Sequence, residues 1–288
     1  MTDLIFHDST KKGIRAFIAH PSHAVLLVGP AGAGKETVAR HIASELLKTS
    51  LEKLAAYPYL SVVTSEDSKS IGIDEVRELQ HFASLKIPRS GQYNRIIIIG
   101  NAHRMTQEAQ NALLKLIEEP PEATLIVLTT PAQQALLPTI TSRCQLITIH
   151  PLEESQAMDY FRNRGHNATQ LQRAWLISGG LAGLMSALLV ADSEHPLVQA
   201  AATARELLQT DAFERLVRVD ELSKQPANTM RDVLLVLQQM ARIALARPAS
   251  SAVRGKWQSV LQGSYDTITA LDKGAQAKLA LTNLMLNL

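Results

Sequence analysis

The sequence predicts an α/β protein whose first half forms a parallel β-sheet and whose second half is helical. Continuous apolar runs such as residues 24–28 and 96–99 are typical of strands that are buried on both faces of a parallel sheet. Segments with helical spacing alternate with these runs, which indicates βα units. After Pro151 the strand signals stop and only helical patterns continue.

Five strands and four helices are expected before Pro151. The apolar runs that predict strands cover residues 24–28, 60–64, 95–99, 125–128 and 145–149. The segments that predict helices cover residues 3–20, 36–47, 73–85 and 107–118. Pro120 and Pro121 follow the last of these helices, and proline cannot continue a helix.

The region after Pro151 is expected to form two helical domains. Residues 153–192 predict a small helical region with breaks at Gly165 and at residues 178–180. A long helix is expected over residues 230–245, and apolar residues at helical spacing continue to Leu286. Three residues are expected to punctuate this part, namely Pro226, Pro248 and Gly263. The predicted domains are residues 1–150, residues 151–193 and residues 194–288.

Composition is that of an ordinary globular protein. Of 288 residues, 46% are hydrophobic and 19% are charged, and a net charge of +2 is too small to argue for nucleic-acid binding. The one cysteine, Cys144, excludes an internal disulfide and a multi-cysteine zinc cluster. The first eight residues lack a basic region that leads into a long apolar stretch, so no secretory signal is expected. The longest apolar runs fall far below the roughly 20 residues that span a bilayer. The expectation is a cytoplasmic protein without membrane contact.

A glycine-rich loop stands between the first strand and the second helix. It has the sequence Gly-Pro-Ala-Gly-Ala-Gly-Lys over residues 29–35, which is the spacing of a phosphate-binding P-loop in its proper strand-to-helix context. Glycines let successive backbone N–H groups face phosphate oxygens, and the helix N-terminus adds a favourable dipole. A glycine-rich turn without a ligand is the alternative. The candidate nucleotide-binding residues are Gly29, Gly32, Gly34, Lys35 and Thr37.

Two departures weaken this nucleotide site. The residue after Lys35 is Glu36 where a P-loop carries Ser or Thr to bind Mg²⁺, and Thr37 is rotated by about 100° along the helix. Binding of ATP or ADP is therefore expected to be weak or absent. The strand 95–99 is followed by Gly100 and Asn101, and neither offers a carboxylate to hold the metal or activate water. His103 is a less favoured base because it lies beyond the strand end.

Arg143 has two interpretations. An arginine at a domain edge often pairs with a carboxylate and adds little stability. The alternative is an arginine finger, which stabilises the charge on a transferring phosphoryl group of another subunit. Cys144 is expected to be a small buried apolar residue. The pair Glu118-Glu119 is expected to form a solvated helix end that faces a neighbouring subunit, and the scattered histidines predict no metal site.

Several segments together resemble a known family. They are Ile71–Leu79, Asn111–Lys115 running into Glu118-Glu119-Pro120-Pro121, Ser142-Arg143-Cys144, and the terminal segment Lys278–Leu286. They look like the bacterial clamp-loader AAA+ subunits of DNA polymerase III, and within that family like the delta-prime type. The resemblance implies an AAA+ P-loop sheet domain, a small helical lid and an all-α collar domain. Thr129 or Thr130 stands at the family's sensor 1 position, with Thr130 taken as the candidate, and the four-cysteine zinc module of many relatives is absent.

The resemblance also implies a function. Such a subunit would belong to a pentameric ring with motor ATPase subunits and a clamp-opening subunit, which loads the sliding clamp onto primed DNA in DNA replication. It would hydrolyse little ATP itself and present Arg143 to the ATP of its neighbour. Two alternatives remain, an autonomous AAA+ ATPase of the gamma/tau motor type and a nucleotide-binding regulatory module outside replication.

Overall fold

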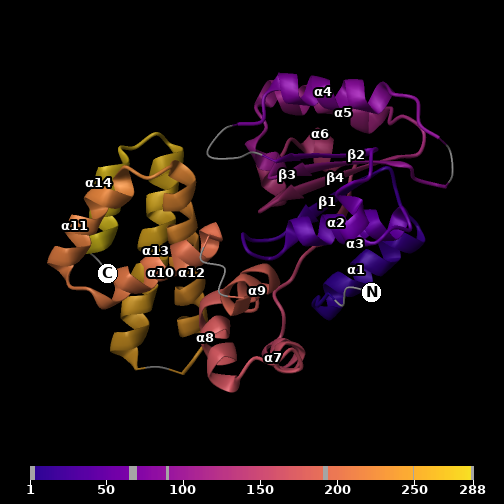
Figure 1. Cartoon of the computed structure of the whole chain (residues 1–288). Helices are drawn as coiled ribbons and strands as arrows, with labels where there is room; N and C mark the ends of the chain where they lie inside the picture. The colour runs from indigo at the N-terminus through magenta and orange to yellow at the C-terminus, as the bar shows by residue number, and fades with distance from the viewer. Residues whose placement is uncertain (1–3, 65–69, 89–90, 191–193, 249, 287–288) are drawn as a thin grey trace. The chain divides into compact units, whose positions relative to one another are not determined.

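The computed structural model describes residues 4–64, 70–88, 91–190, 194–248 and 250–286. The chain divides into two compact units, Met1–Pro151 and Leu152–Leu288, which are described separately here and are seen in Figure 1. The predicted boundary between residues 193 and 194 falls beside residues 191–193, which lie outside the described residues. The division of the second unit into lid and collar therefore stays a prediction.

A five-stranded parallel sheet forms the centre of the first unit, which confirms the predicted α/β fold. The strands are β1 Ala24–Val28, β2 Leu60–Thr64, β3 Arg95–Gly100, β4 Thr124–Thr130 and β5 Gln145–Thr148. Their order across the sheet is β2-β3-β4-β1-β5, and every neighbouring pair is parallel. Each expected strand is present, and its ends lie within two residues of the predicted ends. The order itself was not predicted.

Helices cover both faces of this sheet, as Figure 1 shows. Their bounds are α1 Asp8–Ala19, α2 Lys35–Leu46, α3 Leu51–Leu54, α4 Ile73–Ser84, α5 Gln107–Glu118 and α6 Pro138–Thr141, with 3₁₀ turns η1 Ala102–Arg104 and η2 Gln133–Ala135. The helices α4, α5 and α6 pack on one face, while α1, α2 and α3 lie toward the other. Four of these helices were expected, and α3 and α6 were missed because four residues are too short to show a helical period.

The inner strands β1, β3 and β4 are buried on both faces, as their unbroken apolar runs predict, whereas the edge strands β2 and β5 are only partly buried. Ile97 and Ile99 of β3 belong to a hydrophobic cluster with residues of α4 and α5. Ile96 and Ile98 alternate with them and are equally inaccessible to solvent. Burial on both faces removes about twice the apolar area of a half-exposed strand, which is why the sheet needs two helical layers.

Arg95 at the start of β3 is an exception to this apolar pattern. Its side chain is only 1% exposed, and its guanidinium donates hydrogen bonds to the carbonyl oxygens of Ala83 and Leu85. A third bond reaches Thr124 Oγ1 at 3.3 Å. Carbonyls at a helix C-terminus lack intrahelical donors, so Arg95 closes the end of α4. Burial lowers the pKa of Arg95.

The second unit is entirely helical in its described part. Its helices are α7 Glu154–Arg162, α8 Ala168–Ser178, α9 Ala182–Val190, α10 Pro196–Gln209, α11 Ala212–Ser223, α12 Ala227–Leu245, α13 Ser251–Asp272 and α14 Ala277–Leu286. The expected breaks occur, since Gly165, Gly179 and Gly180 adopt positive φ between helices. Pro226 caps α12, and Pro248 lies between α12 and α13.

One predicted break is wrong. Gly263 lies inside α13 and does not interrupt it. A Cβ atom at this position would stand 2.8 Å from Leu284 Cδ1 of α14, so a larger residue here would have to displace the Leu284 side chain where the two helices approach. Isolated glycines within a helical pattern are ambiguous in this way.

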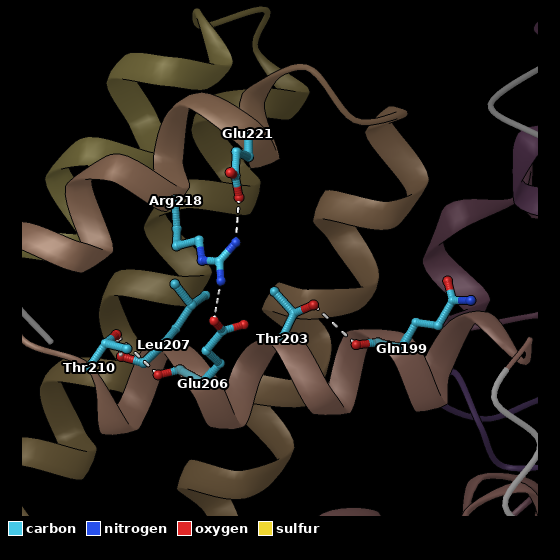
Figure 2. Close-up of polar contacts among 7 residues, drawn as sticks. All are labelled: Gln199, Thr203, Glu206, Leu207, Thr210, Arg218 and Glu221. Carbon is cyan, nitrogen blue, oxygen red and sulfur yellow. Dashed lines mark hydrogen bonds and ion pairs between the residues drawn. The ribbon is translucent and has the colours of Figure 1, made fainter.

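Exposed ion pairs connect the helices of the second unit. Figure 2 shows Arg218 of α11 between Glu206 of α10 and Glu221 of its own helix. Asp220 of α11 pairs with Lys278 of α14 at 2.7 Å. These pairs lie above a buried cluster from α10 to α14 that includes Leu234, Leu237 and Leu284 of the C-terminal helices. Because exposed ion pairs contribute little, the apolar cluster holds these helices together.

No helix among the described residues has both the length and the apolar character needed to cross a bilayer.

Candidate functional site

The glycine-rich loop has the backbone of a phosphate cradle. It leaves the carboxyl end of β1, and α2 begins at Lys35 directly after it. Gly32 and Gly34 have φ values of 79° and 84°, a conformation that residues with a Cβ rarely adopt. The two left-handed turns direct the loop around the N-terminus of α2, where free N–H groups and the helix dipole favour an anion.

The start of the loop is held between two strands. The Gly29 N–H donates to the Thr130 carbonyl oxygen at 3.2 Å, and the Ile149 N–H donates to the Val28 carbonyl oxygen at 2.7 Å. A Cβ atom on Gly29 would lie 3.1 Å from both Cβ and the carbonyl oxygen of Ile149. A side chain at position 29 would therefore crowd Ile149, whether or not a ligand is bound.

Lys35 lies back against its own loop. Its Nζ donates to the carbonyl oxygens of Gly29 at 2.7 Å and Pro30 at 2.8 Å. Burial lowers the pKa of Lys35 to about 8. An ammonium group has three N–H donors, and these two carbonyl oxygens take two of them. Within the described residues, the third N–H is left to bind a ligand. A desolvated cation at the centre of the loop favours an anion beside it.

The charge of Glu36 is turned away from the loop. Arg40, one turn further along α2, donates to Glu36 Oε1 from Nε at 3.1 Å and from Nη2 at 2.8 Å. The pair is exposed, and it draws the carboxylate along the helix toward its C-terminal side. Thr37 lies on the exposed face of α2 and has no hydrogen bond within the described ranges. Sequence analysis missed Arg40, although its spacing of four from Glu36 is a recognised signal.

The carboxyl end of β3, which is separated from β1 by β4, carries no acidic residue at positions 100 and 101. Gly100 ends β3, and a Cβ atom there would stand 2.5 Å from Thr64 Cγ2, so a side chain at this position would need the Thr64 side chain to shift. Asn101 follows with a φ of 51°, and its N–H donates to Thr129 Oγ1 at 3.0 Å. This geometry provides neither a metal ligand nor a general base at residues 100 and 101.

Thr130, the candidate sensor, lies at the end of β4 opposite Val28. Its hydroxyl is fully buried and donates to the Ala132 carbonyl oxygen at 2.9 Å. A hydroxyl whose proton is engaged in this way can offer only lone pairs, and phosphate oxygens need donors. The sensor assignment stays a prediction.

Arg143 lies near the amino ends of the strands, whereas the glycine-rich loop lies at their carboxyl ends. Gln145, two residues later, begins β5 and pairs with Val25 near the start of β1. The loop begins at Gly29, four residues further along β1, and at 3.3 Å per residue this is about 13 Å along the strand direction. Parallel strands thus separate the candidate residues into two sites. Gly29, Lys35 and Thr130 lie at the carboxyl ends of the strands, whereas Arg143 lies at their amino ends.

The Arg143 side chain is exposed and held by acceptors of its own chain. Nη2 forms an ion pair with Glu118 Oε1 at 2.9 Å, and the two side chains are 41% and 47% exposed. Nη1 donates to the Thr139 carbonyl oxygen at 3.0 Å and lies 3.4 Å from Ser142 Oγ. The carboxylate pairing that the alternative interpretation expects is therefore present, and the finger role stays a prediction. Glu118 was expected only as a solvated helix end, and nothing in the sequence linked it to Arg143.

Cys144 is partly buried and packs against the hydrophobic cluster that includes residues of α5 and α6. Burial raises the pKa of its thiol to about 12, which agrees with the expected apolar role. No group of three or more His, Cys, Asp or Glu side chains in the described part of the chain could hold a metal ion.

A five-stranded parallel sheet with a glycine-rich loop at the carboxyl end of the inner strand β1, followed by a helical region, is the arrangement of an AAA+ type of fold. A solved DNA polymerase III gamma subunit-related protein of Thermotoga maritima has the same fold, with a TM-score of 0.53 and 20% identity over 97% of this chain and 98% of that chain. A family model described as DNA polymerase III, delta subunit matches residues 15–153. The first half of the chain is thus similar to the delta-prime and clamp-loader subunits of DNA polymerase III.

Individual relatives show the same similarity. DNA polymerase III subunit delta' of Pseudomonas aeruginosa is 36% identical over 141 residues, which are 44% of this chain and 42% of the relative. DNA polymerase III subunit tau of Bacillus subtilis is 26% identical over 258 residues, 76% of this chain and 45% of the relative. The chain thus spans less than half the length of the curated relatives it matches.

Proposed function

We propose that the chain is a delta-prime-type subunit of the DNA polymerase III clamp loader that hydrolyses little ATP itself and supplies Arg143 as an arginine finger to a neighbouring subunit. The observation that carries this proposal is the position of Arg143. It is exposed at the edge of the sheet opposite its own phosphate loop, where it cannot reach a nucleotide of the same chain. A second subunit would have to bring the triphosphate.

The lack of catalytic groups at residues 100 and 101, at the end of β3, supports the same proposal. Phosphoryl transfer needs a metal-binding carboxylate and a group that activates water. Gly100 and Asn101 provide neither, and a side chain at position 100 would collide with the Thr64 side chain as it stands. A chain with a phosphate cradle but no hydrolytic residues fits a subunit that assists turnover elsewhere.

The proposed partners are the motor ATPase subunits and the clamp-opening subunit of a pentameric ring in the cytoplasm. Through this ring the chain would act on the sliding clamp and on primed DNA, with DNA contacts made to phosphates and not to bases. At its own loop we expect ATP or ADP to bind weakly, because Lys35 and the backbone remain but the Mg²⁺ ligand after Lys35 does not.

The test is a reconstituted loader assayed for DNA-stimulated ATP hydrolysis with wild type and Arg143→Ala. An arginine finger contributes roughly 10³–10⁵ to the rate at the site it serves. In a ring with several ATP sites, the total rate should fall at least by the share of that one site. Arg77→Ala is the matched control, because Arg77 is also an exposed arginine paired with a carboxylate of the same unit. An unchanged rate of ATP hydrolysis with Arg143→Ala would refute the arginine-finger role of Arg143.

The alternative is an autonomous ATPase of the gamma/tau motor type, and the long match to the Bacillus subtilis tau subunit favours it. The isolated chain distinguishes the two. We expect no turnover above background, whereas hydrolysis at motor-like rates that is lost with Lys35→Ala would support the motor function. Co-purification without any loader or polymerase subunit would instead point to the third interpretation, a regulatory module outside replication.

A further inference from the structure

We propose that Glu118 is a positioning residue for Arg143, and that its carboxylate fixes the guanidinium in the orientation in which the arginine meets a phosphate of the neighbouring subunit. This inference rests on the proposed function of Arg143. Glu118 is the last residue of α5, and Arg143 follows α6, so the two are brought together only by the fold.

The guanidinium is held on both of its arms. Nη2 meets Glu118 Oε1 at 2.9 Å, and Nη1 donates to the Thr139 carbonyl oxygen at 3.0 Å. A planar group with two fixed arms has a defined plane, and its remaining N–H donors point in defined directions. The side chain nevertheless stays 41% exposed, so those donors remain open to a ligand from outside the chain.

Helix stability does not explain an acidic residue at this position. The C-terminus of a helix carries partial negative charge, so a glutamate in the last turn of α5 is unfavourable by itself. The exposed pair with Arg143 regains an amount of the same order and no more. Since these two effects nearly cancel, the pair adds little to folding, and what it provides is the orientation of Arg143.

Fixing the arginine before it meets the phosphate lowers the cost of the encounter. A free arginine side chain samples many rotamers, and this freedom is lost when it binds a phosphoryl group. An exposed ion pair can restrict an equilibrium by at most about fivefold. We therefore expect an effect of about threefold to fivefold on kcat at the site that Arg143 serves, far smaller than the effect of removing the arginine.

The experiment uses the reconstituted loader with Glu118→Ala, Glu118→Gln and Arg143→Ala. Glu118→Ala should lower kcat about threefold to fivefold at the site that Arg143 serves, so the total rate should fall by roughly two thirds to four fifths of the loss that Arg143→Ala causes. The KM for ATP should stay unchanged, because ATP is bound by the neighbouring subunit. Glu118→Gln keeps an acceptor oxygen and should fall between wild type and alanine. Glu119→Gln is the matched control, since Glu119 is the adjacent exposed carboxylate and has no ion pair within the described residues.

A double variant separates positioning from a general structural effect. In the Arg143→Ala background, Glu118→Ala should cause no further loss of kcat, because its only path is through the arginine. A rate equal to or above wild type in Glu118→Ala, with Arg143→Ala strongly reduced, would overturn the positioning role alone. If Arg143→Ala itself has no effect, the proposed function fails first.

Discussion

Lys35 gives a prediction that needs only the isolated chain. The perturbation is Lys35→Met, which keeps the length of the side chain and removes its charge. In the folded chain burial lowers the pKa of Lys35 from 10.5 to about 8, so the folded state disfavours the ammonium form. Below pH 8 the lysine is charged in both states, and the folded state bears a cost of about 3 kcal/mol at 1.36 kcal/mol per pKa unit.

The sign of the pH dependence follows from proton counting. Between pH 8 and pH 10.5 the unfolded chain keeps the proton on Lys35 while the folded chain has lost it. Unfolding therefore takes up a proton, and the free energy of unfolding rises with pH in this window. The stability of wild type relative to Lys35→Met should increase by about 2 kcal/mol between pH 7 and pH 9.5.

Urea denaturation followed by circular dichroism, at pH values from 7 to 9.5, measures this difference. Other titrating groups contribute to both proteins and cancel in the comparison. Lys11→Met, on the exposed face of α1, is the control for losing one positive charge and should give a curve parallel to wild type. A difference between wild type and Lys35→Met that stays flat or falls with pH would refute the desolvated lysine.

Two further predictions concern packing and reactivity. Gly255→Ala and Gly263→Ala both replace a glycine within α13, but no atom stands within 4 Å of a Cβ at position 255, whereas Leu284 Cδ1 lies 2.8 Å from one at position 263. Gly255→Ala should stabilise the second unit by about 0.5–1 kcal/mol, and Gly263→Ala should be less stable than Gly255→Ala by about 1–3 kcal/mol. Denaturation followed by Trp257 fluorescence measures both free energies of unfolding. Equal stabilities of the two variants would contradict the close contact between α13 and α14. Cys144, with its thiol pKa raised to about 12, should react with a disulfide reagent at pH 8 on the order of a thousandfold more slowly in the folded chain than in denaturant. Folded and unfolded rates within tenfold of each other would show that the thiol is not buried.

Local pattern was enough to predict most of the elements. The isoleucines of β3 form an unbroken apolar run, and such a run fits a strand covered on both sides. The loop at residues 29–35 was found by its spacing, because backbone dihedral angles and phosphate geometry fix where glycine must stand. Gly263 was misjudged because a glycine that breaks a helix and one that admits a neighbouring helix look alike in sequence.

In the candidate site too, local features could be predicted from the sequence and tertiary contacts could not. Sequence identified Lys35 and Arg143 singly, and the pair formed by Glu36 and Arg40 was visible in principle from its spacing within one helix. It could not tell that Arg143 faces away from its own loop, since that depends on the order of strands in the sheet. The pairing of Arg143 with Glu118 was equally hidden.

The sequence by itself determined the α/β class, the positions of the strands and longer helices, and the residues of the phosphate loop, because each of these is set by neighbours within a few positions along the chain. Only the tertiary structure decided that Lys35 and Arg143 lie at opposite edges of the sheet, that Glu118 holds Arg143, and that Arg95 is buried against the end of α4. These depend on which distant segments meet. Such contacts are selected by the packing of whole elements, and periodicity along the chain records only which face of each element is covered.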